Sequence, residues 1–258
     1  MHDICHQNIP LFVRKLNYRI TGTGPCVIFL HGYLETSRIW SSVSELFTGH
    51  TVIIPELIFS DNYSLPENTD MISFSADVIH SLVTELGFDN YSIVGNSMGG
   101  YIAFEMMRKY QSFIERVVLI STNPFSDNDE KRKKREREIG LLKKGRKGLV
   151  VAALLNGIPD DNIRELYSEM TKKLKTGNLI SAQLSMSHRP DNTGLLRSSE
   201  IDILMIYGEK DETIPVDQLR ELLKNSSAGY CEIPGGTHFV LSLNQNEAEK
   251  CIADFFDL

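Results

Sequence analysis

A serine in a sharply turning segment is the residue of this sequence best suited to nucleophilic chemistry. Ser97 is the centre of Gly95-Asn96-Ser97-Met98-Gly99, which follows a short apolar run and precedes a helical pattern from Tyr101 onward. So tight a turn forces the residue at its tip toward positive φ, and side chains two positions away on either side would clash, which accounts for the glycines. The start of a helix adds positive partial charge that favours a developing anion. The pattern predicts a nucleophile; an ordinary strand-to-helix turn is the alternative.

Two further residues stand where a base and its orienting carboxylate would be needed. A serine hydroxyl is a weak nucleophile unless a neighbouring base takes its proton. Of the seven histidines, His238 follows two glycines and a threonine directly after the last short apolar run. Asp211 lies in the loop after the run 201–207, and a buried carboxylate there would orient the imidazole. Glu209 and Glu212 compete for that role, and solvated loop residues are the alternative throughout.

The elements that must position these residues alternate along the chain. Short runs rich in β-branched and aromatic residues predict strands covered on both faces, as in a parallel sheet. These runs are 26–30, 51–54, 91–94, 116–120, 201–207 and 229–233. Apolar residues at helical spacing lie between them, at 74–86, 102–107, 219–223 and 248–255. The alternation predicts the α/β class, with a mostly parallel, doubly wound sheet.

Two segments depart from this alternation. The rough period of two from Phe12 to Ile20 predicts an outer strand pair with one side exposed to water. Residues 126–198 contain helical stretches and no convincing strand, so we expect a helical insertion between two strands of the sheet. A chain of 258 residues fits one domain of the larger α/β type. We therefore expect a core formed by 1–125 and 199–258, interrupted by 126–198.

Composition and charge argue against several classes of protein. The hydrophobic share of 41% and the charged share of 24% are ordinary for a globular domain, and no apolar run is long enough to span a membrane. The first ten residues lack the basic-then-apolar pattern of a secretory signal. A net charge of −7 argues against general nucleic-acid binding. The widely spaced Cys5, Cys26, Cys231 and Cys251 are interpreted as free thiols in a reducing cytoplasm.

The charge is distributed unevenly. Ten of the 27 basic residues but only two of the 34 acidic ones lie between Lys131 and Lys147, which leaves this segment at +8 and the rest of the chain at −15. The solvated face of a surface helix is the first interpretation of this segment. A positive field that steers acidic substrates is the second, and attachment to anionic lipid is the third.

Together these segments resemble the α/β-hydrolase superfamily over nearly the whole chain. The matching pieces are His31-Gly32 at 31–32, GNSMGG at 95–100, GEKDETIP at 208–215 and GGTHF at 235–239. In that family the nucleophile, the acid and the base follow one another along the chain, and Ser97, Asp211 and His238 have this order.

The resemblance has further structural implications. It implies that 126–198 is a helical cap, and Arg189-Pro190-Asp191-Asn192-Thr193 is similar to the cap exit of small esterases and enol-lactone hydrolases. It also implies an oxyanion hole formed by the backbone N–H groups of Tyr33 and Met98. His31 is then a residue that shapes the loop. One departure stands out, because 55–61 contains no glycine where the family has a Pro-Asp-x-Pro-Gly-x-Gly turn.

The function that the resemblance implies is that of a serine hydrolase. It would cleave a small ester-type substrate, a carboxylic ester or lactone, through an acyl-enzyme. A thioesterase, a carbon–carbon bond hydrolase and a ligand receptor on the same scaffold are the alternatives. No metal or organic cofactor is implied. We expect a monomer or homodimer that binds a small molecule and has no stable membrane anchor.

Overall fold

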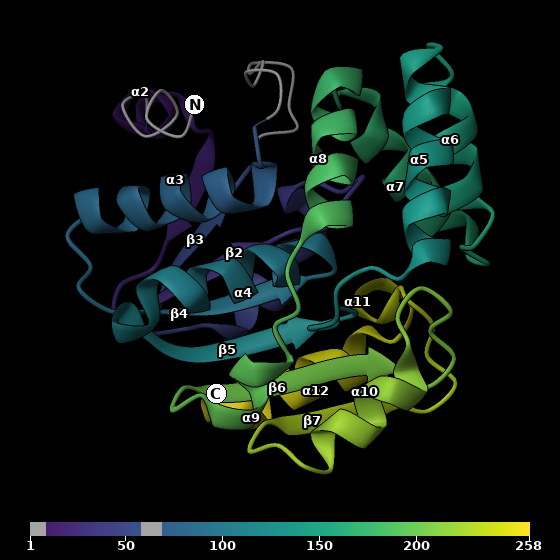
Figure 1. Ribbon diagram of the computed structural model, residues 1–258. Coiled ribbons are helices and arrows are strands. Elements are labelled where there is room, and N and C mark those ends of the chain that lie inside the picture. Colours follow the sequence, from purple (N-terminus) through teal and green to yellow (C-terminus); the bar gives the residue numbers. More distant parts are fainter. Residues whose placement is uncertain (1–8, 58–68) are drawn as a thin grey trace.

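A seven-stranded sheet forms the centre of the computed structural model, which describes residues 9–57 and 69–258 (Figure 1). The strands lie in the order β1-β3-β2-β4-β5-β6-β7. β1 is antiparallel to β3, and every other neighbouring pair is parallel. The strands are β1 (Tyr18–Thr21), β2 (Cys26–Leu30), β3 (Thr51–Pro55), β4 (Tyr91–Asn96), β5 (Ile114–Ile120), β6 (Asp202–Gly208) and β7 (Gly229–Ile233). The mostly parallel sheet predicted from the sequence is confirmed.

Helices cover both faces of this sheet, so that every residue of β2, β3 and β4 is buried. On β2, Cys26, Ile28 and Leu30 belong to one hydrophobic core, whereas Val27 and Phe29 belong to the other. The first core contains side chains of α2 (Ile9–Lys15), α3 (Met71–Glu85), α4 (Met98–Tyr110), α9 (Thr193–Ser198) and α10 (Val216–Leu223). The second contains side chains of the 3₁₀ turns η1 (Ser37–Trp40) and η2 (Val43–Leu46) and of α11 (Val240–Leu243) and α12 (Gln245–Phe256).

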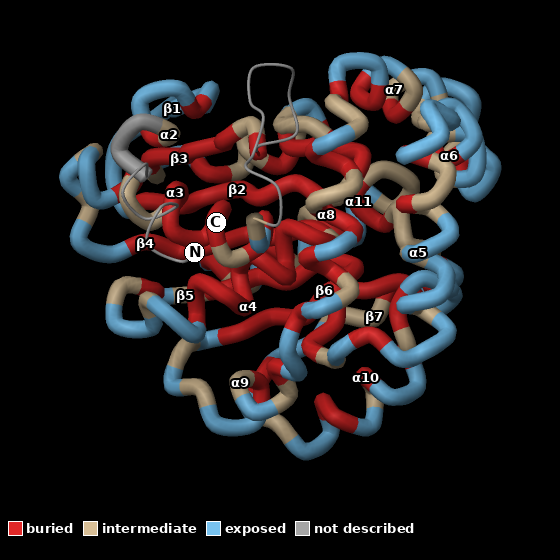
Figure 2. The backbone as a smooth tube through the Cα atoms, turned by 45° about the horizontal axis from the view of Figure 1, so that its top comes forward, coloured by how far each residue is buried: buried red, intermediate tan, exposed pale blue. Residues whose placement is uncertain are grey.

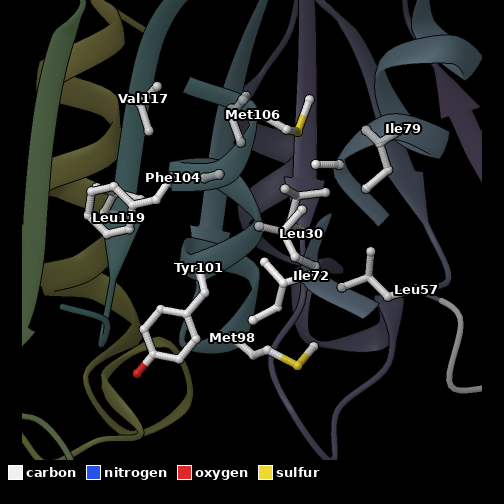
Figure 3. Close-up of a cluster of buried hydrophobic side chains, with 14 of the residues drawn as sticks. Leu30, Leu57, Ile72, Ile79, Met98, Tyr101, Phe104, Met106, Val117 and Leu119 are labelled. Atoms are coloured by element: carbon white, nitrogen blue, oxygen red, sulfur yellow. The ribbon is translucent and has the colours of Figure 1, made fainter. Parts of the chain in front are cut away.

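The first core is the larger of the two and holds α4 rigidly against the sheet. Figure 3 shows Met98 and Phe104 of α4 among side chains of β2 and β5, including Leu30 and Leu119. All four of these side chains are fully buried. Burying a large apolar side chain stabilises a fold by about 1.5–3 kcal/mol. The start of α4, which follows Ser97, is therefore fixed by packing.

The strand register brings four loops to one edge of the sheet. Leu30 of β2 pairs with Gly95 of β4, and Asn96 of β4 pairs with Ile120 of β5. Because parallel strands point the same way, the loops that follow β2, β4, β6 and β7 all leave from the carboxyl ends of the strands. Each sequence segment with candidate chemistry lies in one of these loops.

Helices occupy the long segment between β5 and β6, as expected. They are α5 (Asp129–Lys143), α6 (Lys147–Leu155), α7 (Asp161–Lys172) and α8 (Thr176–His188), followed by α9. Figure 1 shows α5, α6, α7 and α8 grouped beside one end of the sheet, and Figure 2 shows exposed residues along α5, α6 and α7. Asp127, before α5, forms ion pairs with Arg135 of α5 (2.5 Å) and with Arg189 after α8 (2.6 Å). These pairs join the entry and the exit of the insertion.

The basic segment 131–147 is not uniformly solvated. Arg132, Lys133 and Lys134 are exposed, as the first interpretation expects. Arg135 instead contacts Asp127 and Gln183, and Lys131 donates to the backbone oxygen of Thr213. Part of this segment therefore serves to pack α5.

Two expectations from the sequence are wrong. The first half of Phe12–Ile20 is helical up to Lys15, because Val13 is buried and Phe12 packs edge-to-face on Phe74 of α3. Only β1 of the expected strand pair forms.

The cysteines also differ from the free thiols expected. Cys231 of β7 and Cys251 of α12 form a disulfide, because the sheet edge and the last helix pack side by side. Cys26 is a buried free thiol, and Cys5 lies outside the described residues. Between residues 9 and 57 and from 69 onward, no helix has the length and apolar character needed to cross a membrane.

Candidate active site

Ser97 lies at the tip of the turn between β4 and α4, in a strained conformation. Its φ of 50° and ψ of −111° are unusual for a residue other than glycine. Its backbone N–H donates to the carbonyl oxygen of Ile120 at 2.8 Å. A β-carbon added to Gly99 would stand 2.0 Å from the carbonyl oxygen of Leu30, and one added to Gly95 would stand 2.7 Å from that of Gly99. The two glycines of the sequence pattern are therefore steric requirements of the turn.

The structure brings the three residues singled out in the sequence together. Ser97 Oγ lies 3.1 Å from Nε2 of His238. Nδ1 of the same imidazole lies 2.8 Å from Oδ2 of Asp211. With Nδ1–H donating to the carboxylate, Nε2 is free of a proton and can accept the one on Ser97. The arrangement can deprotonate a serine hydroxyl as it attacks an electrophile.

Asp211 is held as an acceptor on both of its oxygens. Its side chain has no exposed surface, and Oδ1 accepts from the backbone N–H groups of Thr213 (2.7 Å) and Ile214 (3.2 Å). Oδ2 is left for His238. Glu209, one of the competing carboxylates, instead accepts from the N–H of Gly235 at 2.8 Å, and Glu212 is exposed.

The loops that carry Asp211 and His238 are in direct main-chain contact with each other. A β-carbon on Gly208 would stand 2.3 Å from the carbonyl group of Gly236, and Lys210 N–H donates to the Gly236 oxygen at 2.8 Å. Such an approach is open only to glycine. The distance between carboxylate and imidazole is thus set by main-chain packing.

The loop after β2 lies directly beside Ser97. A β-carbon on Gly32 would stand 3.1 Å from Cβ of Ser97, so Tyr33, the next residue, is a neighbour of the serine. Met98 is the first residue of α4, and N–H groups in the first turn of a helix have no partner within the helix. Both backbone amides predicted as oxyanion donors therefore stand beside Ser97. Their role as donors stays a prediction.

His31 shapes this loop, as expected. Its ring is fully buried, and Nε2 accepts from the backbone N–H of Leu57 at 3.0 Å. Nδ1 therefore carries the proton and lies 3.0 Å from the carbonyl oxygen of Gly32. Burial lowers the pKa of His31, which keeps the ring neutral. The segment 55–61, whose lack of glycine was noted above, is described only as far as Leu57.

Three residues near the site were missed in the sequence. Glu35 is buried and accepts from the N–H of Gly32 (2.5 Å) and from Nδ2 of Asn96 (3.0 Å to each oxygen). The hydroxyl of Tyr167, on α7, donates to Glu35 Oε1 at 3.1 Å. An acidic residue four positions after His31 was the available signal for Glu35. Nothing comparable pointed to Tyr167 or Asn96.

The described parts of the chain, 9–57 and 69–258, contain no cluster of three or more His, Cys, Asp or Glu side chains able to hold a metal ion. The polar groups at the site are those of acid–base and nucleophilic chemistry.

Comparison with known proteins gives a family match over part of the chain. Residues 25–137 match the family model described as alpha/beta hydrolase fold. An uncharacterized protein of Mycobacterium tuberculosis is 29% identical over 105 residues, which are 40% of this chain and 31% of that protein. The match thus spans about a third of the length of this curated relative.

Two other proteins are similar over almost the whole chain. The 2-(acetamidomethylene)succinate hydrolase of Mesorhizobium japonicum is 24% identical over 258 residues, covering 94% of this chain and 91% of that protein. The solved structure of a thermophilic esterase from Thermogutta terrifontis has a TM-score of 0.86 at 23% identity, covering 94% of this chain and 93% of that one. At this identity the structural likeness shows the fold.

Proposed function

The chain belongs to the α/β-hydrolase superfamily, and from that premise we propose that it is a serine hydrolase that cleaves small carboxylic esters or lactones through an acyl-enzyme. The observation that carries the proposal is the pair of contacts made by His238, 3.1 Å to the Ser97 hydroxyl and 2.8 Å to the Asp211 carboxylate. A nucleophile, a base and an orienting acid in this geometry are the parts that acyl transfer requires.

In the first half of the proposed reaction, Ser97 Oγ forms a bond to the substrate carbonyl carbon while His238 Nε2 takes its proton. The carbonyl π electrons move onto the oxygen, which the N–H groups of Tyr33 and Met98 hold. The carbon–oxygen bond to the alcohol then breaks, and the imidazolium returns its proton to the leaving alkoxide. The acyl group stays on Ser97.

In the second half, water replaces the alcohol. His238 takes a proton from water as its oxygen attacks the acyl carbon, and a second tetrahedral intermediate forms in the same hole. Collapse breaks the bond to Ser97 Oγ, which regains a proton from the imidazolium, and the acid leaves. Asp211 holds the tautomer throughout and stabilises the positive imidazolium.

We further propose that 126–198 acts as a cap on the core formed by 1–125 and 199–258. Tyr167 supports this division, because its side chain is almost fully buried and reaches Glu35 beside the site from within the insertion. The ring of Tyr167 also packs edge-to-face on Phe239, next to His238, with centroids 5.4 Å apart. A cap in this position would border the substrate on the side away from the sheet.

The decisive test compares the wild-type protein with Ser97→Ala on short nitrophenyl esters and simple lactones. We expect kcat to fall by about 10⁴-fold or more, because alanine has no hydroxyl with which to form the acyl-enzyme. Ser112→Ala, an exposed serine beyond the far end of α4, is the matched control and should keep wild-type turnover. Equal hydrolysis by wild type and Ser97→Ala, with both folded, would contradict the proposal.

A second candidate follows from the likeness over nearly the whole chain to a 2-(acetamidomethylene)succinate hydrolase. The same triad could then act on an enamide-type substrate that carries carboxylates. A panel of esters, lactones, thioesters and acylated enamines, each assayed with and without Ser97→Ala, separates these substrate classes. A large ligand-induced rise in Tm with no turnover on any of them would instead support a receptor.

A further inference from the structure

A buried carboxylate that the proposed mechanism does not use lies behind the loop that carries Tyr33. Glu35 is 5% exposed, and the contacts that its side chain makes are with donors: Gly32 N–H, the Asn96 amide and the Tyr167 hydroxyl. A β-carbon on Gly32 would stand 2.7 Å from Oε2 of Glu35 and 3.1 Å from Cβ of Ser97. The carboxylate and the serine therefore both border the space that a side chain on residue 32 would occupy.

Two of these donors stand one residue before a part of the proposed machinery. Gly32 precedes Tyr33, whose N–H is a proposed oxyanion donor. Asn96 precedes Ser97, the proposed nucleophile. One carboxylate accepts from both residues. It therefore links the loop after β2, which carries Tyr33, to the turn after β4, which carries Ser97.

The loop after β2 requires this support, because its backbone is strained. Leu34 has a φ of 62°, in the left-handed region that costs a residue with a β-carbon about 1 kcal/mol or more. The N–H of Glu35 donates to the oxygen of Gly32 at 3.4 Å, and its carboxylate accepts from the Gly32 N–H at 2.5 Å. The carboxylate thus closes a turn that the chain does not favour on its own.

Protonation would disturb this arrangement. Burial raises the pKa of Glu35, while the donors Asn96, Gly32 and Tyr167, and a positive charge on His238, act in the opposite direction. An ionised carboxylate can accept from all three donors at once. A protonated one would direct its own O–H toward a donor.

We propose that Glu35 is a positioning residue for the proposed acyl transfer: its carboxylate holds Gly32 and Asn96 so that the Tyr33 N–H and Ser97 keep one relative geometry. Tyr167 ties that geometry to the inserted helices, because its hydroxyl reaches the same carboxylate from α7. This inference rests on the proposed function. It adds a group that touches neither substrate nor the transferred proton.

Glu35→Gln tests the proposal with almost no change in volume. Asn96 Nδ2 lies 3.0 Å from both carboxylate oxygens, so the new NH₂ of glutamine must face the amide of Asn96 or force it to turn over. We expect kcat on a short nitrophenyl ester to fall by about 10- to 100-fold, with KM changed by less than about threefold. A loss confined to kcat is expected when the donors of the transition state are misplaced.

Two further variants keep the test independent of folding. Glu105→Gln removes a buried carboxylate of α4 that contacts Arg108 and Lys109, and it should leave kcat and KM unchanged. Tyr167→Phe removes a single donor and retains the ring. We expect an intermediate loss of kcat from it, with a Tm close to that of the wild type.

A readout that does not depend on turnover completes the test. The amide proton of Gly32, donated to a carboxylate at 2.5 Å, should resonate far downfield in the wild type and move upfield in Glu35→Gln. Wild-type kcat in folded Glu35→Gln, or an unchanged Gly32 resonance, overturns the proposal and leaves the hydrolase assignment intact. Equal turnover by wild type and Ser97→Ala instead removes the proposed function and the role of Glu35 with it.

Discussion

Gly32 and Ser97 are in such close contact that a β-carbon on the glycine would stand 3.1 Å from the β-carbon of the serine. The same added atom would stand 2.7 Å from Oε2 of Glu35. The loop after β2 and the turn after β4 therefore meet without space for a methyl group. Pairing of Leu30 with Gly95 in the sheet brings the starts of these two segments side by side.

Gly32→Ala should impair both activity and stability. Its methyl group must push the Glu35 carboxylate or Ser97 away, and either movement changes the site. We expect kcat/KM to fall at least about tenfold, with a loss of about 1–3 kcal/mol in the free energy of unfolding. Ester hydrolysis and urea unfolding measure the two effects. Gly148→Ala, where a β-carbon meets nothing within 4 Å, is the control, and equal kcat/KM for the two variants would count against this account.

Two other glycines should respond to alanine in opposite directions. At Gly99 the new β-carbon would stand 2.0 Å from the carbonyl oxygen of Leu30, a backbone atom that cannot turn away. We expect Gly99→Ala to lose at least about 3 kcal/mol of stability or not to fold. Gly140 lies within α5 with nothing near it, so Gly140→Ala should gain about 0.5–1 kcal/mol. Thermal unfolding checks both; a stable Gly99→Ala would show that α4 can move away from β2.

The sequence predicts those elements whose pattern has a single physical solution. Five consecutive apolar residues at Cys26–Leu30 predict a strand covered on both faces, and β2 has these bounds and is buried throughout. Ser97, Asp211 and His238 could be singled out because each stands just after a strand. The rough period of two from Phe12 to Ile20 predicts strands, but α2 continues to Lys15, and its packing on Phe74 of α3 is a contact that the pattern does not reveal.

Contacts between distant segments are what the sequence does not reveal. Asn96 and Tyr167 are 61 and 132 residues away from Glu35, and no spacing rule connects such positions. The disulfide is similar, because Cys231 and Cys251 approach only after α12 has packed on β7. Triad geometry follows from sheet topology, whereas the groups that support it depend on side-chain packing.

Reduction of the disulfide should lower Tm. Cys231 and Cys251 are 20 residues apart, and closing a loop of this size restricts the unfolded chain by about 3 kcal/mol. For a chain of this length that corresponds to about 6–12 °C. Differential scanning calorimetry with and without reductant measures the shift in Tm, and the double variant Cys231→Ala/Cys251→Ala should show no such shift.

Burial raises the pKa of Cys26 to about 12, so this thiol should not react in the folded protein.

The state of these cysteines also bears on location. If the protein resides in a reducing compartment, alkylation and mass spectrometry of the isolated protein should find Cys231 and Cys251 as free thiols. The cytoplasmic location stays a prediction until that measurement. An unchanged Tm under reductant would mean that the disulfide does not form.

Asp127→Asn should destabilise the fold strongly at neutral pH and less in acid. Burial alone would raise the pKa of Asp127, but its hydrogen bonds and ion pairs with Arg135 and Arg189 outweigh burial and lower it from its ordinary value of 3.8. A carboxyl group whose pKa is lower in the folded state stabilises the protein above the unfolded-state pKa and loses that contribution as pH falls through the folded-state pKa.

The size of the effect follows from the two arginines that the substitution leaves behind. The side chains of Asp127 and Arg189 are 0% and 3% exposed, and removing one partner of such a buried pair costs about 3–5 kcal/mol. Urea unfolding at pH 7 should show this loss, and the difference from wild type should shrink as the pH is taken below 3.8. Asp129→Asn, which removes a 90% exposed partner of Arg132, is the control and should change little at any pH. A loss for Asp127→Asn that is equal at neutral and acid pH would mean that lost packing, and not lost charge, is the cause.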